Sequence, residues 1–127
     1  MIAGWHHIAI ICSDIEKSVR FYIEVFNFRE QHRVFRSERN SWKVDLVHAN
    51  KMTIELFTFP DAPTRNSYPE ALGLRHIAFA VQNLDTMLKR LELLHIPFEA
   101  IRIDPETKKR FTFLADPDNL PIELYEI

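Results

Sequence analysis

The sequence contains very little glycine and very little cysteine. Only 2 of its 127 residues are glycine and only 1 is cysteine. Two glycines cannot form a glycine-rich phosphate loop, and no Gly-x-Gly-x-x-Gly pattern occurs, so a nucleotide cofactor is not expected. The single cysteine, Cys12, excludes an intrachain disulfide. Because Cys12 ends an apolar segment, it is expected to be a buried and unreactive thiol.

An excess of charge of one sign and long apolar runs are also missing. Lys and Arg number 16 against 18 for Asp and Glu, so the net charge of −2 favours neither nucleic acid nor a membrane surface as a partner. No apolar run approaches the ~18 residues that cross a bilayer, and no secretion signal is recognisable. The chain has 46% hydrophobic residues, enough for the core of one domain. We expect a cytoplasmic protein that binds a small molecule.

Two histidines and two glutamates recur at matching positions in the two halves of the chain. His7 precedes Ile-Ala-Ile-Ile and His76 precedes Ile-Ala-Phe-Ala, while Glu55 and Glu123 each follow Ile and precede Leu and an aromatic residue. The histidines are 69 residues apart and the glutamates 68 residues apart, so one offset superimposes both pairs. The sequence therefore predicts a tandem duplication with one His and one Glu in each copy.

Both copies show the order β-α-β-β-β, which predicts an α+β fold of two modules. Helical spacing of apolar residues predicts helices over 15–26 and 84–94, capped by Ser13 or Asp14 and by Asn83. Alternating patterns predict strands over 5–12, 28–34, 42–48, 51–59, 74–81, 97–103, 110–115 and 121–127. The first module covers about residues 1–60, a proline-containing linker covers 61–73, and the second module covers about 74–127.

The predicted strands place each glutamate on the face opposite its aliphatic neighbours, because side chains alternate across a strand. Small alanines on the faces that carry the histidines leave room for a ligand. Two carboxylates in one enclosed space repel each other unless a metal ion or a proton compensates their charge. Together the four side chains would form an N2O2 site for a divalent metal, with ligands His7, Glu55, His76 and Glu123.

A single His or Glu on a strand is more often a surface or core residue than a ligand, but the matched offset of both pairs favours the metal site. The other four histidines have no such counterpart. They are expected to be surface or capping residues, with His6 at the rim of the site: His6, His32, His48 and His95.

The whole chain resembles the vicinal oxygen chelate superfamily, whose members pair two β-α-β-β-β modules into a curved mixed sheet around a divalent metal. Glyoxalase I is the member whose ligands are His, Glu, His and Glu. The segments Gly73–Phe79, Lys109–Phe113 and Asp116–Tyr125 resemble more specifically a bacterial branch of glyoxalase-like proteins of undefined substrate. The resemblance implies a homodimer with one Ni²⁺, Zn²⁺ or Co²⁺ per site.

The resemblance also implies an activity. A metal-dependent lyase or isomerase of the glyoxalase I type would convert a small substrate with vicinal oxygens through an enediolate. Glu123 would be the general base, and Glu55 would be a ligand and a second acid–base group.

Two departures weaken the case for glutathione as the substrate. Short bacterial glyoxalase I enzymes place an Arg and an Asn where this chain has Ile11 and Phe59. Other basic residues in or beside the strands are candidates to replace them, namely Arg36, Arg39, Lys43, Lys108 and Arg110.

Two alternative functions remain open on the same scaffold. One is an extradiol-type dioxygenase, an epimerase or a fosfomycin-modifying enzyme, in which the first Glu ligand is changed or missing. The other is an antibiotic-binding protein that uses no metal. Glu55 disfavours the first alternative, and the complete set of four ligands disfavours the second.

Overall fold

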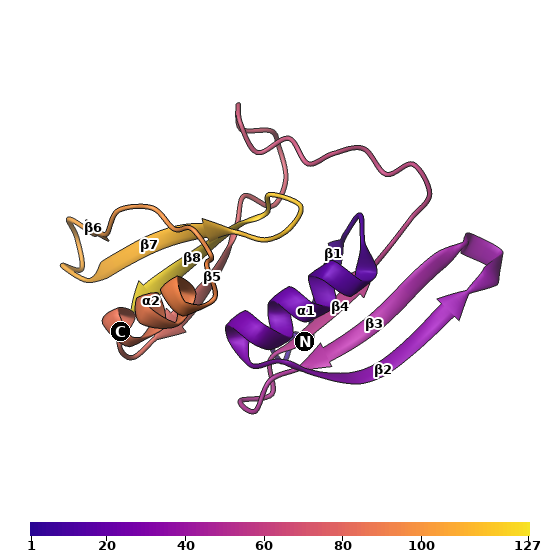
Figure 1. Cartoon of the computed structure of the whole chain (residues 1–127), viewed down its shortest axis with the longest axis horizontal. Coiled ribbons are helices and arrows are strands. Elements are labelled where there is room, and N and C mark those ends of the chain that lie inside the picture. Colours follow the sequence, from indigo (N-terminus) through magenta and orange to yellow (C-terminus); the bar gives the residue numbers. More distant parts are fainter. The chain divides into compact units, whose positions relative to one another are not determined.

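The computed structural model describes residues 1–127 and has the two β-α-β-β-β modules that the sequence predicts (Figure 1). The elements of the first module, with one short 3-10 helix, are β1 (Ile8–Ile11), α1 (Ile15–Phe26), β2 (Arg29–Arg36), η1 (Ser37–Arg39), β3 (Ser41–Val47) and β4 (Thr53–Phe57). Those of the second module are β5 (Ile77–Val81), α2 (Leu84–Leu93), β6 (Arg102–Ile103), β7 (Arg110–Ala115) and β8 (Pro121–Glu126).

The chain divides into an N-terminal unit, Met1–Thr64, and a C-terminal unit, Arg65–Ile127. Each unit contains a four-stranded mixed sheet, in the order β1-β4-β3-β2 in the first and β5-β8-β7-β6 in the second. The first strand of each unit pairs in parallel with the last strand, and the other neighbours are antiparallel. The identical topology confirms the predicted α+β fold class of tandem modules.

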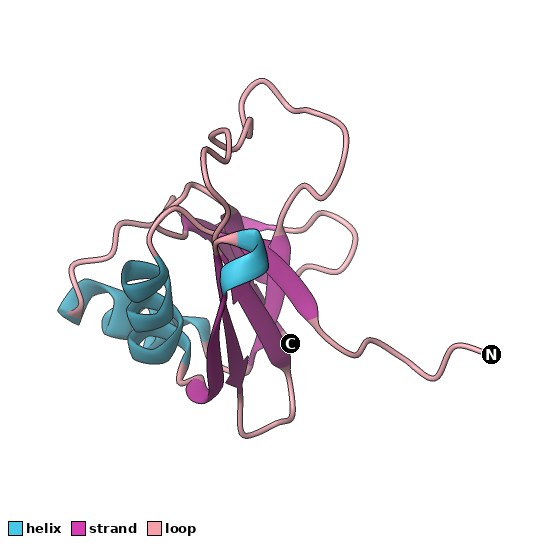
Figure 2. Ribbon diagram, turned by 90° about the vertical axis from the view of Figure 1, so that its right-hand side faces the viewer, coloured by secondary structure: helices cyan, strands magenta, loops and turns pink.

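In the N-terminal unit, helix α1 packs against one face of the sheet and leaves the opposite face without a helix (Figure 2). The Asp14 side chain caps the helix by accepting the Lys17 N–H, and Asn27 ends it in the left-handed region with φ of 60°. The sheet residues beneath the helix are at most 2% exposed: Val44, Leu46, Ile54 and Leu56. We call the opposite face, which carries Ala9, Lys43, Asp45, Glu55 and Phe57, the open face of this unit.

The C-terminal unit repeats the arrangement, with α2 packed against β8. Asn83 caps α2 by accepting the Thr86 N–H, and the apolar residues Leu84, Leu91, Ile122 and Leu124 are fully buried. The Glu126 carboxylate accepts the Leu84 N–H at 2.8 Å and pairs with Arg110 at 2.9 Å. These contacts, with Arg110 first, lower the pKa of Glu126 to about 2.

The helices and the strands β7 and β8 lie within one residue of their predicted bounds, but the strand predicted over 97–103 is mostly wrong. Only Arg102–Ile103 is a strand. The Glu99 N–H donates to the Phe113 carbonyl at 2.9 Å, and the Thr112 hydroxyl donates to the Glu99 carbonyl at 2.6 Å. A side-chain hydrogen bond therefore replaces part of the ladder, beside a proline at position 97 that has no N–H to donate.

Strands β1 and β5 also begin later than predicted. Their ladders start with Ile8 opposite Ile54 and with Ile77 opposite Ile122. His7 and His76 therefore stand immediately before these strands, where the backbone is not held by the sheet.

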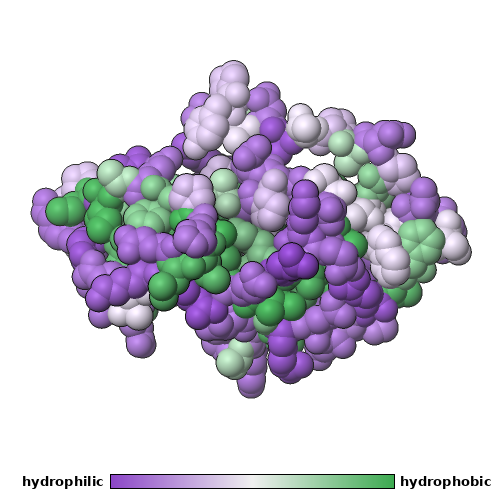
Figure 3. All heavy atoms as spheres, viewed as in Figure 1, coloured by the Kyte–Doolittle hydropathy of each residue, from purple (hydrophilic) through white to green (hydrophobic).

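Apolar side chains (green) reach the surface among polar ones (purple) in Figure 3. On the open face of the N-terminal unit, Ile11 is 56% exposed.

Neither α1 nor α2 has the length and the apolar composition required to cross a membrane.

Candidate functional site

The first candidate pair, His7 and Glu55, lies on the open face of the N-terminal unit. Glu55 occupies the middle of β4, with Ala9 of β1 on one side and Asp45 of β3 on the other. His7 Nδ1 lies 3.1 Å from Glu55 Oε2, and the two side chains are 37% and 14% exposed. His6 Nδ1 lies 2.9 Å from His7 Nδ1, so His6 stands beside this candidate pair.

Lys43 is a third member of this group. Its Nζ lies 3.3 Å from Glu55 Oε1 and 2.7 Å from Asp45 Oδ1. The hydrogen bonds to Asp45 and to Glu55 raise the pKa of Lys43 above its ordinary value, although burial acts in the opposite direction. The ammonium group therefore stays charged and partly neutralises both carboxylates.

Asp45 was not among the predicted site residues. The signal that identifies it is the Lys-x-Asp spacing in a strand, which places both side chains on one face. The register then sets Asp45 directly beside Glu55. Sequence reasoning missed this residue because cross-strand register is a tertiary property.

The second candidate pair, His76 and Glu123, lies in the C-terminal unit. His76 Nε2 is 3.0 Å from Glu123 Oε2, and the side chains are 27% and 14% exposed. The His76 ring packs edge-on against Phe113 at 5.1 Å between centroids, and Phe113 is the cross-strand neighbour of Glu123. His76 Nδ1 is buried and has no hydrogen-bond partner. No lysine or arginine pairs with Glu123.

The geometry of each pair fits two neighbouring ligands of one divalent ion. Ligand bonds of about 2.1 Å at right angles put the two donor atoms about 3.0 Å apart. The measured separations are 3.1 Å for His7–Glu55 and 3.0 Å for His76–Glu123. Each unit thus presents one imidazole nitrogen and one carboxylate oxygen, and the chain contains no group of three or more His, Cys, Asp or Glu that could hold a metal.

The remaining histidines and the cysteine behave as predicted. His48 Nδ1 accepts the Asn50 N–H at 3.2 Å in the turn before β4, and His95 adopts a positive φ of 57° just after α2. His32 is exposed on β2. Cys12 is 2% exposed, in agreement with a buried thiol.

The basic residues proposed to replace the glutathione-binding positions differ in their availability. Arg110 pairs with Asp85 and Glu126 at 3.1 and 2.9 Å, so its charge is already used within the C-terminal unit. Lys108 occupies a turn with φ of 63°. Arg36 and Arg39 instead lie over the aromatic rings of Phe57 and Phe59.

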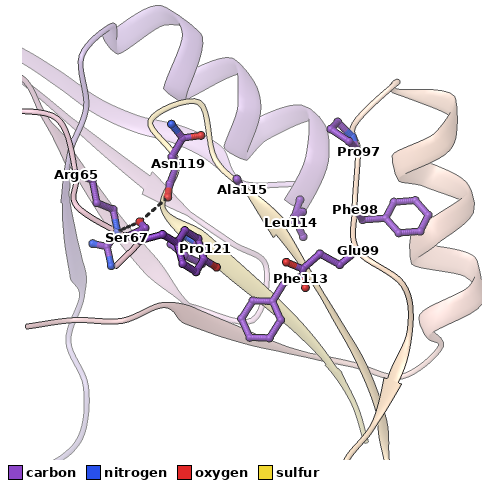
Figure 4. A pocket seen from close by; sticks show the side chains of 11 residues that line it. Arg65, Ser67, Pro97, Phe98, Glu99, Phe113, Leu114, Ala115, Asn119 and Pro121 are labelled. Carbon is purple, nitrogen blue, oxygen red and sulfur yellow. Dashed lines mark hydrogen bonds between the residues drawn. The ribbon is translucent and has the colours of Figure 1, made fainter. Parts of the chain in front are cut away.

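A pocket of about 560 Å³ opens in the C-terminal unit (Figure 4). Its walls combine apolar side chains with a few polar groups, as is typical of small-molecule sites. Arg65 Nε donates to Ser67 Oγ at 2.8 Å, and the Ser67 hydroxyl donates to the Asn119 carbonyl at 3.0 Å. Phe113 lines this pocket and also contacts His76, so the pocket borders the second candidate pair.

The sequence profile of the "Glyoxalase/Bleomycin resistance protein/Dioxygenase superfamily" matches residues 4–124. The chain belongs to this superfamily. The vicinal oxygen chelate resemblance drawn from the sequence is therefore confirmed.

Two bacterial proteins are similar to this chain over nearly its whole length. Uncharacterized protein YwkD of Bacillus subtilis is 54% identical over 99% of this chain and 98% of its own. Uncharacterized protein YaeR of Escherichia coli is 51% identical over 95% of this chain and 94% of its own.

Solved structures of superfamily members share the fold. A glyoxalase family protein from Enterococcus faecalis is 40% identical with a TM-score of 0.91, and the match covers 98% of both chains. The fosfomycin resistance protein FosX from Listeria monocytogenes, solved as a mutant with Mn(II) and 1S,2S-dihydroxypropylphosphonic acid, has a TM-score of 0.75. FosX is 24% identical over 98% of this chain and 93% of its own, so it shows the shared fold alone.

Proposed function

We propose that this protein is a divalent-metal-dependent, glyoxalase I-like lyase or isomerase that acts on a small substrate with vicinal oxygens. The observation that carries the proposal is the repeated pair. In both units one imidazole nitrogen lies 3.0–3.1 Å from one oxygen of a glutamate that is 14% exposed. Two such pairs supply a complete N2O2 ligand set.

The ligands in this proposal are His7, Glu55, His76 and Glu123, acting in a homodimer. The ion, Ni²⁺, Zn²⁺ or Co²⁺, would polarise a substrate carbonyl and stabilise the negative charge that develops on its oxygen. Imidazole with carboxylate suits all three ions, so the donor set does not choose among them. The Mn(II) described for FosX supports including manganese in the test.

Glu123 is the better general base of the two glutamates. Lys43 and His7 hold the two carboxylate oxygens of Glu55, whereas the only ion pair of Glu123 is with His76. A carboxylate that moves between two positions needs few fixed partners. Glu123 takes the proton from the C–H beside the substrate carbonyl and returns it to the neighbouring carbon, so the net reaction is an isomerisation.

The first test is elemental analysis of the purified protein beside its Glu55→Ala and His76→Ala variants. We expect stoichiometric metal in the wild type and loss of metal in both variants. The metal-loaded wild type is then assayed with the hemithioacetal of methylglyoxal and glutathione. Metal without turnover directs the search to other vicinal-oxygen substrates, while no metal under any loading condition contradicts the proposal and favours a binding protein.

A mixing experiment shows which chains supply the four ligands. His7→Ala and His76→Ala proteins are each inactive in this proposal. If a site takes one pair from each of two chains, the mixed dimer contains one intact site and recovers about half of the activity of one wild-type dimer. If a single chain supplies all four ligands, the mixture stays inactive.

A further inference from the structure

A second group of charged and aromatic side chains lies in the N-terminal unit, near but outside the His7–Glu55 pair. The Arg36 guanidinium, at the end of β2, lies 4.9 Å from the ring centroid of Phe57 and 5.8 Å from that of Phe59. Arg39 in η1 lies 5.8 Å from the Phe59 ring. Rings at these distances attract the cations and restrict their motion.

Arg36 is fixed in place but only partly satisfied. Its Nη2 donates to Ser41 Oγ at 3.0 Å, while its Nε is buried and has no acceptor. Neither Arg36 nor Arg39 forms an ion pair with a carboxylate, whereas Arg33 on the same strand pairs with Glu16 and Glu30. A positioned guanidinium with unused donors and an uncompensated charge favours an oxyanion ligand.

We propose that Arg36 and Arg39, with Phe57 and Phe59, form a subsite for the anionic group of the substrate. The ligand group is a carboxylate or a phosphate-type oxyanion, because the guanidinium fork matches two oxygens of either. This inference rests on the proposed function, because that function places the vicinal oxygens of the same substrate at the His–Glu pairs. Binding of the anion itself requires no metal and no turnover.

The spacing of residues along β4 sets the length of this substrate. Glu55 and Phe57 are two residues apart on one strand and one face, which corresponds to about 7 Å. Lys43 is opposite Phe57, between the arginine pair and the carboxylates of Asp45 and Glu55. It therefore separates the negative charges of the metal pair from the bound anion. The structure indicates a small organic anion whose charged group lies about 7 Å or more from its vicinal oxygens.

The test is an NMR titration of metal-free, ¹⁵N-labelled protein, following the Nε–Hε signal of Arg36 and, in every variant, the backbone amide signals of residues 36–41. A buried Nε exchanges slowly with water, so the Arg36 signal is observable near neutral pH. Inorganic phosphate and acetate are added separately at constant ionic strength. We expect a saturable shift of the Arg36 Nε–Hε signal and of the backbone amide signals of residues 36–41, and the tighter of the two probes identifies the oxyanion class.

Variants assign the binding to the two arginines. We expect Arg36→Gln to weaken binding of the probe about tenfold and Arg39→Gln about threefold, as loss of charge-assisted hydrogen bonds predicts. Arg36→Lys keeps the charge without the fork and should fall between these values and the wild type. Arg20→Gln, exposed on α1, is the matched control and should leave binding within twofold.

Two results would overturn the subsite. One is an Arg36 signal in the wild type that moves with neither probe. The other is an equal loss of binding in Arg20→Gln and Arg36→Gln, which would indicate that the anion is attracted by the overall charge of the protein and not by a specific site. If Arg36→Gln does not fold, the wild-type signal and Arg39→Gln decide. Because the assay is metal-free, anion binding in a protein that binds no metal contradicts the proposed function alone, and metal binding without anion binding contradicts the subsite alone.

Discussion

The two His–Glu pairs consist of the same residue types at the same relative positions, yet their neighbours differ. In the N-terminal unit, Lys43 bridges Glu55 and Asp45. In the C-terminal unit, the neighbour of Glu123 is the Phe113 ring, and the β7 cation, Arg110, pairs with Glu126 and Asp85 instead. The duplicated His–Glu pair thus has a charge-compensated carboxylate in one unit and an uncompensated carboxylate in the other. The difference supports separate roles, with Glu55 as a fixed ligand and Glu123 as a ligand that also transfers protons.

The largest expected effect comes from the two glutamates themselves. Glu123→Gln should reduce kcat by about 10²–10⁴-fold, the usual contribution of a general base, while the amide oxygen retains much of the metal. Glu55→Gln should instead lose mainly metal, because the Lys43 ammonium 3.3 Å from the Glu55 carboxylate is then less well balanced and repels the ion. Excess metal should restore much of the activity. Turnover and metal content are measured on the same samples. Equal behaviour of the two variants would remove the distinction between the pairs.

Truncating a core residue beneath either pair should lower the stability of the protein by a similar amount. Leu56 and Leu124 follow the two glutamates and are both fully buried. Truncation of either to Ala should lower the free energy of unfolding by about 2–5 kcal/mol, because a cavity replaces well-packed atoms. Urea denaturation followed by circular dichroism measures both. A loss below 1 kcal/mol in one variant only would show that the duplicated cores are not equivalent.

Lys43 is the residue that distinguishes the two pairs, so its removal should make them more alike. Lys43→Met should tighten binding of a divalent metal about fivefold, since a partly exposed ion pair that competes with the metal contributes about 1 kcal/mol. Isothermal titration calorimetry with Zn²⁺ measures the change. Lys89→Met, exposed on α2, is the control and should leave the affinity unchanged. Weaker binding in Lys43→Met would mean that Lys43 organises Glu55 for the metal.

The smallest expected effect concerns the ion pair between Arg110 of β7 and Glu126 of β8 in the C-terminal unit. The pKa of Glu126 is lowered to about 2 from 4.5, so the pair stabilises the protein fully above pH 4.5 and loses this contribution as the pH falls toward 2. Glu126→Gln should therefore lower Tm at pH 7, and its Tm should approach that of the wild type at low pH. Glu106→Gln, exposed in a loop, should match the wild type at both pH values.

The succession of helices and strands could be predicted from the sequence because it depends on local patterns. Asp14 and Asn83 begin their helices through side-chain caps that lie within three residues of their partners. The strand predicted over 97–103 was mostly wrong because its structure depends on contacts with a distant part of the chain. Its apolar residues suit a strand, but a hydrogen bond from Thr112 to the Glu99 carbonyl decides how it attaches to β7.

The sequence by itself determined the duplication, the four candidate ligands and the pairing of one His with one Glu in each half, since these follow from residue identity and spacing. Only the tertiary structure decided which groups surround each pair. Register across β3 and β4 placed Lys43 and Asp45 beside Glu55, and register across β7 and β8 placed Phe113 beside Glu123. The tertiary structure also decided that Arg36 lies over Phe57. Contacts between residues distant along the chain depend on how the strands align, and they leave no periodic signal in the sequence.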